Sequence, residues 1–290
     1  MTIPSEGLSE LAKQSGSTVS FTAEAVTVTG AGGSKSDAIR LDVAVNGKSV
    51  DTVPGGLTVT VPAADAGIVL VLVAEDGTET IIRKSVTADG EVAGLVDGPC
   101  TVKVVDNAKT FTDTSGHWAE DAIDFASSRE LFNGISATAF SPNEEMTRAM
   151  LVTVLHRMED EAETAVENAF ADIPDDTWYT DAVIWASENG IVNGVAEGQF
   201  DPNANVTREQ LAAMMYRYAD FLGMDTAASG GLSRFHDGSQ VSSWASDAMK
   251  WAVGNGLISG KSSTILDPKG NATRAEVATI LQRMTALMVK

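Results

Sequence analysis

One pattern occurs three times between residues 111 and 290, and this repeat constrains the fold more than any other feature of the sequence. In each copy a Trp is followed by a Gly after 16 residues, a Pro after 24 and an Arg after 30. The three sets are Trp118, Gly134, Pro142 and Arg148; Trp178, Gly194, Pro202 and Arg208; and Trp244, Gly260, Pro268 and Arg274. Self-similarity at constant spacing is the signature of a repeat architecture, so we expect three equivalent structural units.

Each copy is predicted to form a helix, a Gly-containing loop, a Pro turn and a second helix. Apolar residues at helical spacing give the first helix a buried face: Ala122, Ile123 and Ala126, then Ala182, Val183 and Ala186, then Ala248, Met249 and Ala252. The second helix is expected to begin at a Thr. Capping boxes are predicted at Thr207 with Gln210 and at Thr273 with Glu276, whereas the equivalent residue in the first copy, Met150, cannot return the hydrogen bond.

Residues 17–105 instead alternate with the two-residue period of β-strands, as in Leu41, Val43 and Val45. Asn-Gly or Asp-Gly pairs, which tolerate the positive φ of tight hairpins, interrupt this pattern at residues 46–47, 76–77, 89–90 and 97–98. We therefore expect several antiparallel hairpins. A short amphipathic helix between Pro4 and Gly16 is expected to precede them.

The change of period near residue 110 predicts a multidomain α+β chain of 290 residues. An antiparallel β-rich module is expected to occupy residues 1–109. The helical repeats are expected to occupy residues 110–168, 169–232 and 233–290. With 43% hydrophobic residues, the chain has enough apolar side chains for a substantial core.

The excess of acidic residues makes some classes of binding partner unfavourable. Forty acidic against 20 basic residues give a formal net charge of −20, which disfavours nucleic-acid binding and polybasic membrane docking. No apolar run approaches the roughly 20 residues that cross a bilayer, so no membrane insertion is expected. The single Cys100 excludes an intramolecular disulfide and any metal site built from several thiolates. No hydrolase, nucleotide or calcium motif is visible, so we predict a protein that is not an enzyme, with no catalytic residue, metal or cofactor.

The repeated motif, F-x-D, H-W-A, N-G, F-x-P and T-R-A-E, resembles the S-layer homology domain, which occurs as three tandem copies in surface proteins of Gram-positive bacteria. The resemblance implies a pseudo-threefold helical assembly. Its inter-repeat grooves would bind the secondary cell wall polymer, an anionic polysaccharide linked to peptidoglycan that commonly carries a pyruvyl ketal. It also implies export to the cell wall, although the first 16 residues do not read as an export signal. Self-assembly into a lattice is left open.

The resemblance assigns polymer-binding roles to four equivalent positions in each copy. These are the arginines Arg148, Arg208 and Arg274; the aromatics Trp118, Trp178 and Trp244; the loop glycines Gly134, Gly194 and Gly260; and the acids Asp113, Asp172 and Asp237. Three residues depart from the motif: Tyr179 in the H-W-A position, Met150 in place of the capping Glu, and Leu266 in place of the F-x-P aromatic. Because of these departures, the three sites are not expected to bind the polymer with equal affinity.

Simple physical chemistry supports these roles and offers alternatives. Unpaired amides at a helix N-terminus, with an Arg one residue after the cap, suit a carboxylate. A Trp face can stack on a sugar, and a Gly lets a ligand approach the backbone. Lys261 follows Gly260 and is expected to bind the polymer as a second cation beside Arg274, so the copy containing Arg274 is predicted to form the most cationic and strongest site. Alternatively, the Trp residues pack in the core, the Asp residues cap turns, and the methionines at 146, 150, 158, 214, 215 and 284 are core residues.

Two functions follow as hypotheses. In the first, the repeats anchor an exported protein non-covalently to the wall polymer, with the β module as a spacer. In the second, the β module is itself an adhesin or carbohydrate-binding domain, and the repeats only tether it.

Overall fold

The computed structural model describes residues 10–11, 18–227 and 230–289. The helix expected between Pro4 and Gly16 lies outside these residues except for Glu10 and Leu11, and Leu11 is buried. The chain divides into two compact units. The first contains residues 1–110, 124–130 and 284–290, and the second contains residues 111–123 and 131–283.

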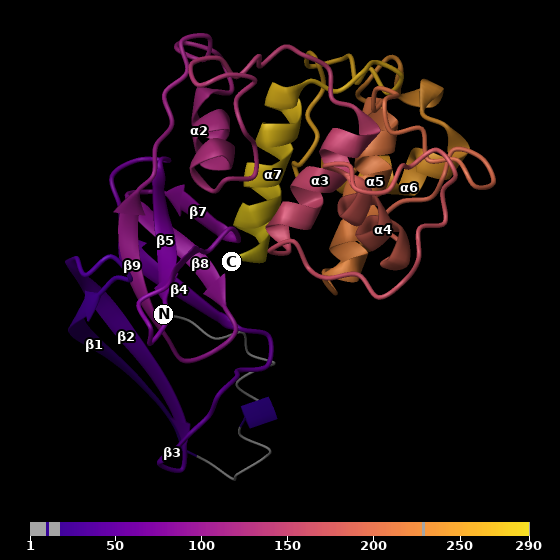
Figure 1. Cartoon of the computed structure of the whole chain (residues 1–290). Helices are drawn as coiled ribbons and strands as arrows, with labels where there is room; N and C mark the ends of the chain where they lie inside the picture. Colours follow the sequence, from indigo (N-terminus) through magenta and orange to yellow (C-terminus); the bar gives the residue numbers. More distant parts are fainter. Residues whose placement is uncertain (1–9, 12–17, 228–229, 290) are drawn as a thin grey trace. The chain divides into compact units, whose positions relative to one another are not determined.

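The first unit is built from two antiparallel sheets (Figure 1). One has the strand order β1-β2-β9-β5-β6 with β3 beside β2, and the other has the order β4-β8-β7. The strands are β1 (Val19–Thr29), β2 (Lys35–Val45), β3 (Lys48–Ser49), β4 (Leu57–Pro62), β5 (Ile68–Val73), β6 (Glu79–Ile81), β7 (Ser85–Ala88), β8 (Glu91–Val96) and β9 (Cys100–Asp106). Leu41 and Val43 of β2, Leu57 of β4 and Val92 of β8 belong to one buried cluster, so the core draws on both sheets.

Two of the four predicted hairpin turns have the expected geometry throughout. Asn46-Gly47 and Asp89-Gly90 have positive φ at both residues, as a two-residue hairpin requires. At residues 76–77 only the Gly has positive φ, and at residues 97–98 neither residue does. Gly98 is needed for another reason: a Cβ there would lie 2.7 Å from the carbonyl oxygen of Asp51.

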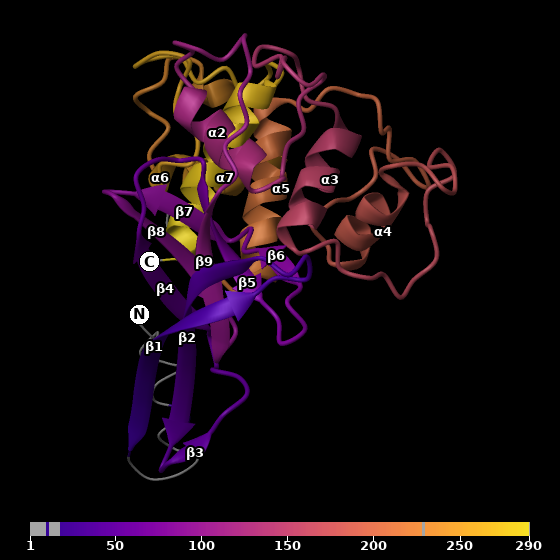
Figure 2. The same ribbon diagram turned by 60° about the vertical axis from the view of Figure 1, so that its left-hand side comes forward.

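Each repeated copy contains two α-helices, as the helical spacing predicts; most of α2 and the end of α7 fall within the first unit. The first helices are α2 (Glu120–Ser128), α4 (Thr180–Glu188) and α6 (Ser246–Gly254), the last preceded by the 3₁₀ turns η1 (Gly238–Gln240) and η2 (Ser243–Ala245). The second helices are α3 (Arg148–Met158), α5 (Arg208–Phe221) and α7 (Arg274–Met288). Helices α3, α5 and α7 lie side by side in both views, and α4 and α6 flank them (Figures 1 and 2). All nine residues predicted for the apolar faces of the first helices are buried.

The three copies are joined in a closed cycle by backbone hydrogen bonds just before the second helices. The N–H of Val206 donates to Met146, that of Ala272 donates to Val206, and that of Met146 donates to Ala272, each at 2.9 Å. Each copy therefore receives one bond from a neighbour and gives one to the other neighbour. This arrangement agrees with the expected pseudo-threefold assembly.

One buried cation in the first unit was not anticipated from the sequence. Arg129, directly after α2, is fully buried and donates to the carbonyl oxygens of Ser85, Ala66 and Ile68. A fragment ending at residue 109 would leave these three carbonyls without that donor, which costs free energy for each buried acceptor. The whole chain, rather than a fragment ending at residue 109, is therefore the protein to use in tests of function. Within the described residues, no helix is long and apolar enough to span a membrane.

Candidate ligand-binding grooves

The repeated Arg of each second helix reaches into the next copy. Its Nε donates to the carbonyl of the residue in the F-x-P position, and its Nη2 donates to the carbonyl of the residue before the loop glycine. The bonds run from Arg148 to Phe200 (2.8 Å) and Asn193 (3.0 Å), from Arg208 to Leu266 (3.0 Å) and Ser259 (2.6 Å), and from Arg274 to Phe140 (2.9 Å) and Asn133 (2.7 Å). Each Arg is thus a clamp between two copies.

These clamps are buried, and an aromatic ring supports two of them. The guanidinium carbons of Arg148 and Arg274 each lie 4.5 Å from the centre of the F-x-P ring of the copy they reach, Phe200 and Phe140 respectively. Burial lowers the pKa of both arginines from the ordinary value. An Arg side chain nevertheless stays charged at neutral pH. Each groove therefore holds a fixed cation whose orientation is set by two backbone carbonyls.

The N-termini of the second helices are not open anion sites, so that expectation is wrong. The N–H groups of Arg148 and Ala149 donate to the carbonyls of Ala204 and Pro202 in the second copy, at 2.9 and 3.0 Å. Equivalent bonds bind the first two amides of α5 and α7, and the Thr side chain before each helix accepts the third. The assembly itself uses the amides that an anion would need. Both predicted capping boxes are confirmed, at Thr207 with Gln210 and at Thr273 with Glu276.

The F-x-D acids stabilise the turn before the second helix, which is the alternative role expected for them. Both carboxylate oxygens of Asp172 accept backbone N–H bonds, from Phe200 at 2.8 Å and Asp201 at 2.7 Å, and Asp201 has a left-handed φ of 59°. Asp113 and Asp237 make the same pair of bonds in their own copies. Each acid therefore stabilises a strained turn, and no ligand is needed to explain it.

Because of these bonds, the three acids should make the chain acid-sensitive. The N–H of Phe140 holds the pKa of Asp113 below its ordinary value of 3.8, and the N–H of Leu266 does the same at Asp237. At Asp172 burial acts in the opposite direction, but the N–H bonds outweigh it and the pKa is again lowered. A carboxyl with a lowered folded-state pKa stabilises the fold above its unfolded value, and this contribution is lost as the pH falls below it.

We expect the melting temperature of the unmodified chain to fall as the pH drops below about 4. The Asp113→Asn, Asp172→Asn and Asp237→Asn variants should melt at lower temperatures at neutral pH. They should also lose less stability in acid. Thermal unfolding between pH 3 and pH 7 measures both effects. An unchanged acid dependence in all three variants would contradict this assignment.

The repeated tryptophans are exposed, unlike the other two tryptophans of the chain. Trp118, Trp178 and Trp244 are 65%, 62% and 57% exposed. In contrast, Trp185 and Trp251 are buried in the helical core. The core-packing alternative is therefore wrong for the repeated Trp, and three flat apolar faces are open to a ligand. Among the methionines expected in the core, Met150 is half-buried and the others are buried.

The loop glycines are required by the protein's own backbone. A Cβ at Gly134 would lie 2.5 Å from the carbonyl oxygen of Ser136 and 2.7 Å from that of Ala139. At Gly194 and Gly260, too, two carbonyl oxygens from the same loop occupy the place of a Cβ. The loop thus folds back on the glycine. The loop's own carbonyl oxygens, and not the approach of a ligand, explain why each copy has a glycine here.

Two grooves combine these elements from all three copies. The Arg208 groove, with a volume of about 440 Å³, is lined by Arg208, Gly260 and Lys261 together with Trp118 and Glu276. The Arg148 groove, of about 390 Å³, is lined by Arg148, Gly194, Trp244, Gln210 and Arg217. Each groove thus takes its clamp Arg from one copy, its loop and second helix from the next, and its Trp from the third.

In the third set, Arg274 contacts the loop of Gly134, and Trp178 lines a cavity of about 410 Å³. Arg274 binds Asn133 beside Gly134, as its counterparts do in the other two grooves. Trp178 lines a cavity with His156 and Arg157, and Arg274 is not among the residues that line that cavity. We call the surface around Arg274 and Gly134 the Arg274 groove.

The comparison with known families agrees with this threefold construction. The S-layer homology domain family matches residues 110–149, 169–212 and 234–278. The chain carries three S-layer homology domains.

Its relatives are surface-layer proteins and large enzymes. Over 69% of its length the chain is 31% identical to the surface-layer 125 kDa protein of Lysinibacillus sphaericus, and it covers 17% of that protein. It is 32% identical over 60% of its length to an amylopullulanase of Thermoanaerobacterium thermosulfurigenes, and it covers 9% of that enzyme. The chain is also 31% identical over 61% of its length to an exoglucanase of Acetivibrio thermocellus, and it covers 16% of that enzyme. The chain thus spans less than a fifth of each of these three relatives, and the enzyme names refer to much larger proteins.

S-layer homology domains are anchoring modules that hold surface-layer proteins and surface enzymes to the cell wall. The three domains of this chain accordingly indicate a location at the bacterial cell surface, associated with the wall. The expected family and location are confirmed.

Two groups of groove residues in these domains were missed from the sequence. A second Arg stands nine residues after each clamp Arg, at positions 157, 217 and 283, about two and a half turns further along the second helix. Arg157 and Arg283 donate to the carbonyls of Leu131 and Leu257, which are equivalent residues of their own copies. The constant spacing of nine was the available signal. The second group is the capping position, where Gln210 lines the Arg148 groove and Glu276 lines the Arg208 groove, and where the first copy has Met150.

Lys261 also lies elsewhere than expected. Arg274 reaches the first copy, whereas Lys261 lines the groove of Arg208. The prediction that Lys261 strengthens the site of Arg274 is therefore wrong, because an Arg and the loop that follows it in sequence belong to different grooves.

Proposed function

We propose that the three S-layer homology domains anchor an exported protein non-covalently to the cell wall by binding an anionic wall polysaccharide in the grooves between them. The observation that carries this proposal is the pairing, within single grooves, of a clamped Arg with an exposed Trp from a different copy. An oriented guanidinium binds a carboxylate, and an indole face stacks on the apolar face of a sugar ring.

A secondary cell wall polymer with pyruvyl ketals is the proposed ligand. A pyruvyl ketal places a carboxylate on a sugar, and this combination matches a cation beside an aromatic face. In a chain with a net charge of −20, attraction over long distances is weak, so the local cations have to supply the binding. The polymer-contacting residues are proposed to be the clamp arginines, the three exposed tryptophans and Lys261. The β-rich module of residues 1–109 is proposed to be a spacer, followed by repeats at 110–168, 169–232 and 233–290.

The tryptophans give the cleanest test because their side chains are exposed and contribute little to the core. We expect each single Trp→Ala change at 118, 178 or 244 to weaken sugar binding at the groove or cavity that the Trp lines roughly three- to tenfold, with an unchanged melting temperature. The triple variant should no longer sediment with purified wall fragments, because losses at linked sites multiply.

Phe21→Ala in β1 is the matched control, since Phe21 is an exposed aromatic residue of the first unit. This control should sediment like the unmodified chain, and chemical removal of the polymer from the walls should abolish sedimentation of both. If Phe21→Ala abolishes binding while the triple Trp variant binds normally, the β module is the binding domain and the anchor assignment fails.

A further inference from the structure

We propose that Glu276 closes the Arg208 groove to ligand carboxylates, so that the grooves of Arg148 and Arg274 are the ones that take them. The inference rests on the proposed function and deepens it, because it assigns the carboxylate of an anionic sugar to two of three sites that the repeat makes equivalent in sequence.

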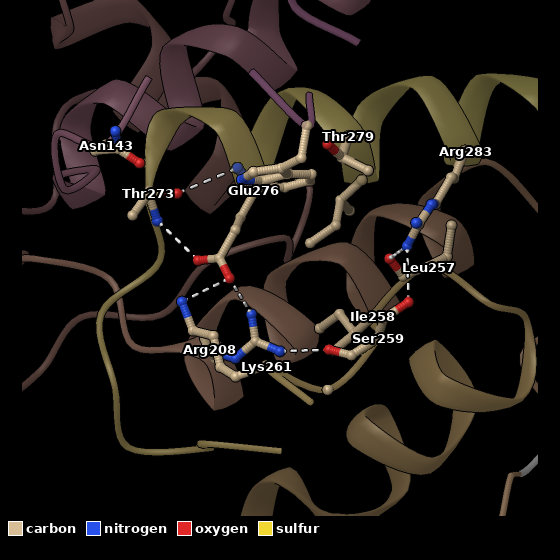
Figure 3. Close-up of a pocket in the computed structure, with 13 residues that line it drawn as sticks. Asn143, Arg208, Leu257, Ile258, Ser259, Lys261, Thr273, Glu276, Thr279 and Arg283 are labelled. Carbon is tan, nitrogen blue, oxygen red and sulfur yellow. Dashed lines mark hydrogen bonds and ion pairs between the residues drawn. The ribbon is translucent and has the colours of Figure 1, made fainter. Parts of the chain in front are cut away.

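The evidence is an ion-pair network that lies within the Arg208 groove (Figure 3). One carboxylate oxygen of Glu276, Oε1, lies 2.6 Å from Nη1 of Arg208 and 2.7 Å from Nζ of Lys261. The other oxygen accepts the N–H of Thr273 at 3.0 Å. The side chains of Arg208 and Glu276 are 4% and 12% exposed. The protein's own carboxylate thus occupies the Arg208 nitrogen that the two backbone carbonyls leave available.

The other two grooves have no carboxylate at this position. Gln210 replaces Glu276 in the Arg148 groove, and Met150 stands at the equivalent position of the first copy, which is the copy that Arg274 reaches. Across residues 18–227 and 230–289, no hydrogen bond or ion pair is made by Nη1 of Arg148 or of Arg274. Nη1 of both guanidinium groups thus has no direct partner, although nearby acids, Asp201 and Asp172 at Arg148 and Glu144 and Asp113 at Arg274, oppose the lowering of each pKa. The direct pairing at Arg208 comes from one residue of the capping box.

A ligand carboxylate entering the Arg208 groove would have to displace Glu276. The intramolecular carboxylate competes at an effective concentration of roughly millimolar or more, because the helix holds it beside its partner. Displacement would also leave two like charges side by side in a poorly hydrated groove, which is unfavourable. The Arg208 groove is therefore left for the uncharged sugars of the polymer.

The capping position allows two matched substitutions, because each copy has a different residue there. Glu276→Gln places the residue of the second copy in the third, and Gln210→Glu does the reverse; both side chains can still return the capping bond. We expect calorimetry with a pyruvylated disaccharide to find two sites in the unmodified chain. A third site should form in Glu276→Gln, with affinity raised at least about tenfold at the Arg208 groove, and one site should remain in Gln210→Glu.

The double variant Glu276→Gln with Gln210→Glu keeps the formal charge of the chain and should again bind two, which separates local pairing from net charge. Three equal sites in the unmodified chain, or an unchanged stoichiometry in Glu276→Gln, would overturn the role of Glu276 and leave the anchoring proposal standing. No binding of the disaccharide by any variant, with the triple Trp variant still sedimenting with walls, would instead overturn the proposed function.

Discussion

Replacing Arg274 with alanine is expected to lower the melting temperature of the whole chain by at least about 5 °C, in addition to any effect on sugar binding. The substitution leaves the carbonyls of Phe140 and Asn133 without their donor, and each unsatisfied buried acceptor costs about 1–3 kcal/mol. For a domain of this size, 1 kcal/mol corresponds to roughly 2–4 °C. The stacking of the guanidinium on Phe140 is lost as well.

Two variants make this result interpretable. Arg234→Ala removes an exposed Arg that also stacks on a ring, that of Phe235, and should change the melting temperature little. Arg274→Lys keeps the charge but loses the two-pronged clamp, so it should destabilise nearly as much as alanine. If Arg274→Ala melts like the unmodified chain, the Arg is not a clamp. Wall-binding losses in clamp variants should therefore be read only alongside their stability.

Gly194→Ala is expected to be among the most damaging single substitutions in the chain. The carbonyl oxygens of Gln199 and Ala196 lie where the new Cβ would be placed, so the loop has to open. Overpacking of this kind costs roughly 3 kcal/mol. Because Arg148 binds the carbonyl of Asn193 next to this glycine, an opened loop would also weaken that clamp.

Gly198→Ala in the same loop is the control. Gly198 has a φ of 67° and nothing within 4 Å of a Cβ, so alanine there costs only the left-handed conformation, roughly 1–2 kcal/mol. Urea unfolding of the two variants gives the comparison. A smaller loss of stability in Gly194→Ala than in Gly198→Ala would show that the loop accommodates the methyl group and that the glycine is needed for something else.

Local features of this chain could be predicted from its sequence because they depend on neighbouring residues. The apolar faces of α2, α4 and α6, the capping boxes of α5 and α7, and the strand periods all follow from spacings of two to four residues. The partner of each clamp Arg could not be predicted in this way. Equal spacing in three copies is compatible with an Arg that contacts its own loop or that of another copy, and the structure shows the latter.

The motif residues also illustrate why a repeated position does not reveal its own reason. Gly194 and Asp172 recur because the backbone turns tightly against them, whereas Trp178 recurs with its side chain in solvent. All three match the family motif equally well. Interatomic distances and exposure distinguish them, and neither is encoded in a spacing. Arg129 is a further case, since its three carbonyl partners are more than 40 residues away.

The cycle of bonds among Met146, Val206 and Ala272 has a consequence for how many copies such an assembly can have and when it can form. In an open stack of repeats, copies can be added or lost at the ends, because each contacts only its neighbours. Here the last copy closes on the first, with Arg274 holding residues 134 and 141 positions earlier. In a chain with two copies, one set of the hydrogen bonds between copies could not form. A fourth copy would have no free partner, because the three copies already bond to one another in a closed cycle. During synthesis the loop of the first copy can be clamped only after the third copy has been made, so the closed arrangement requires all three copies.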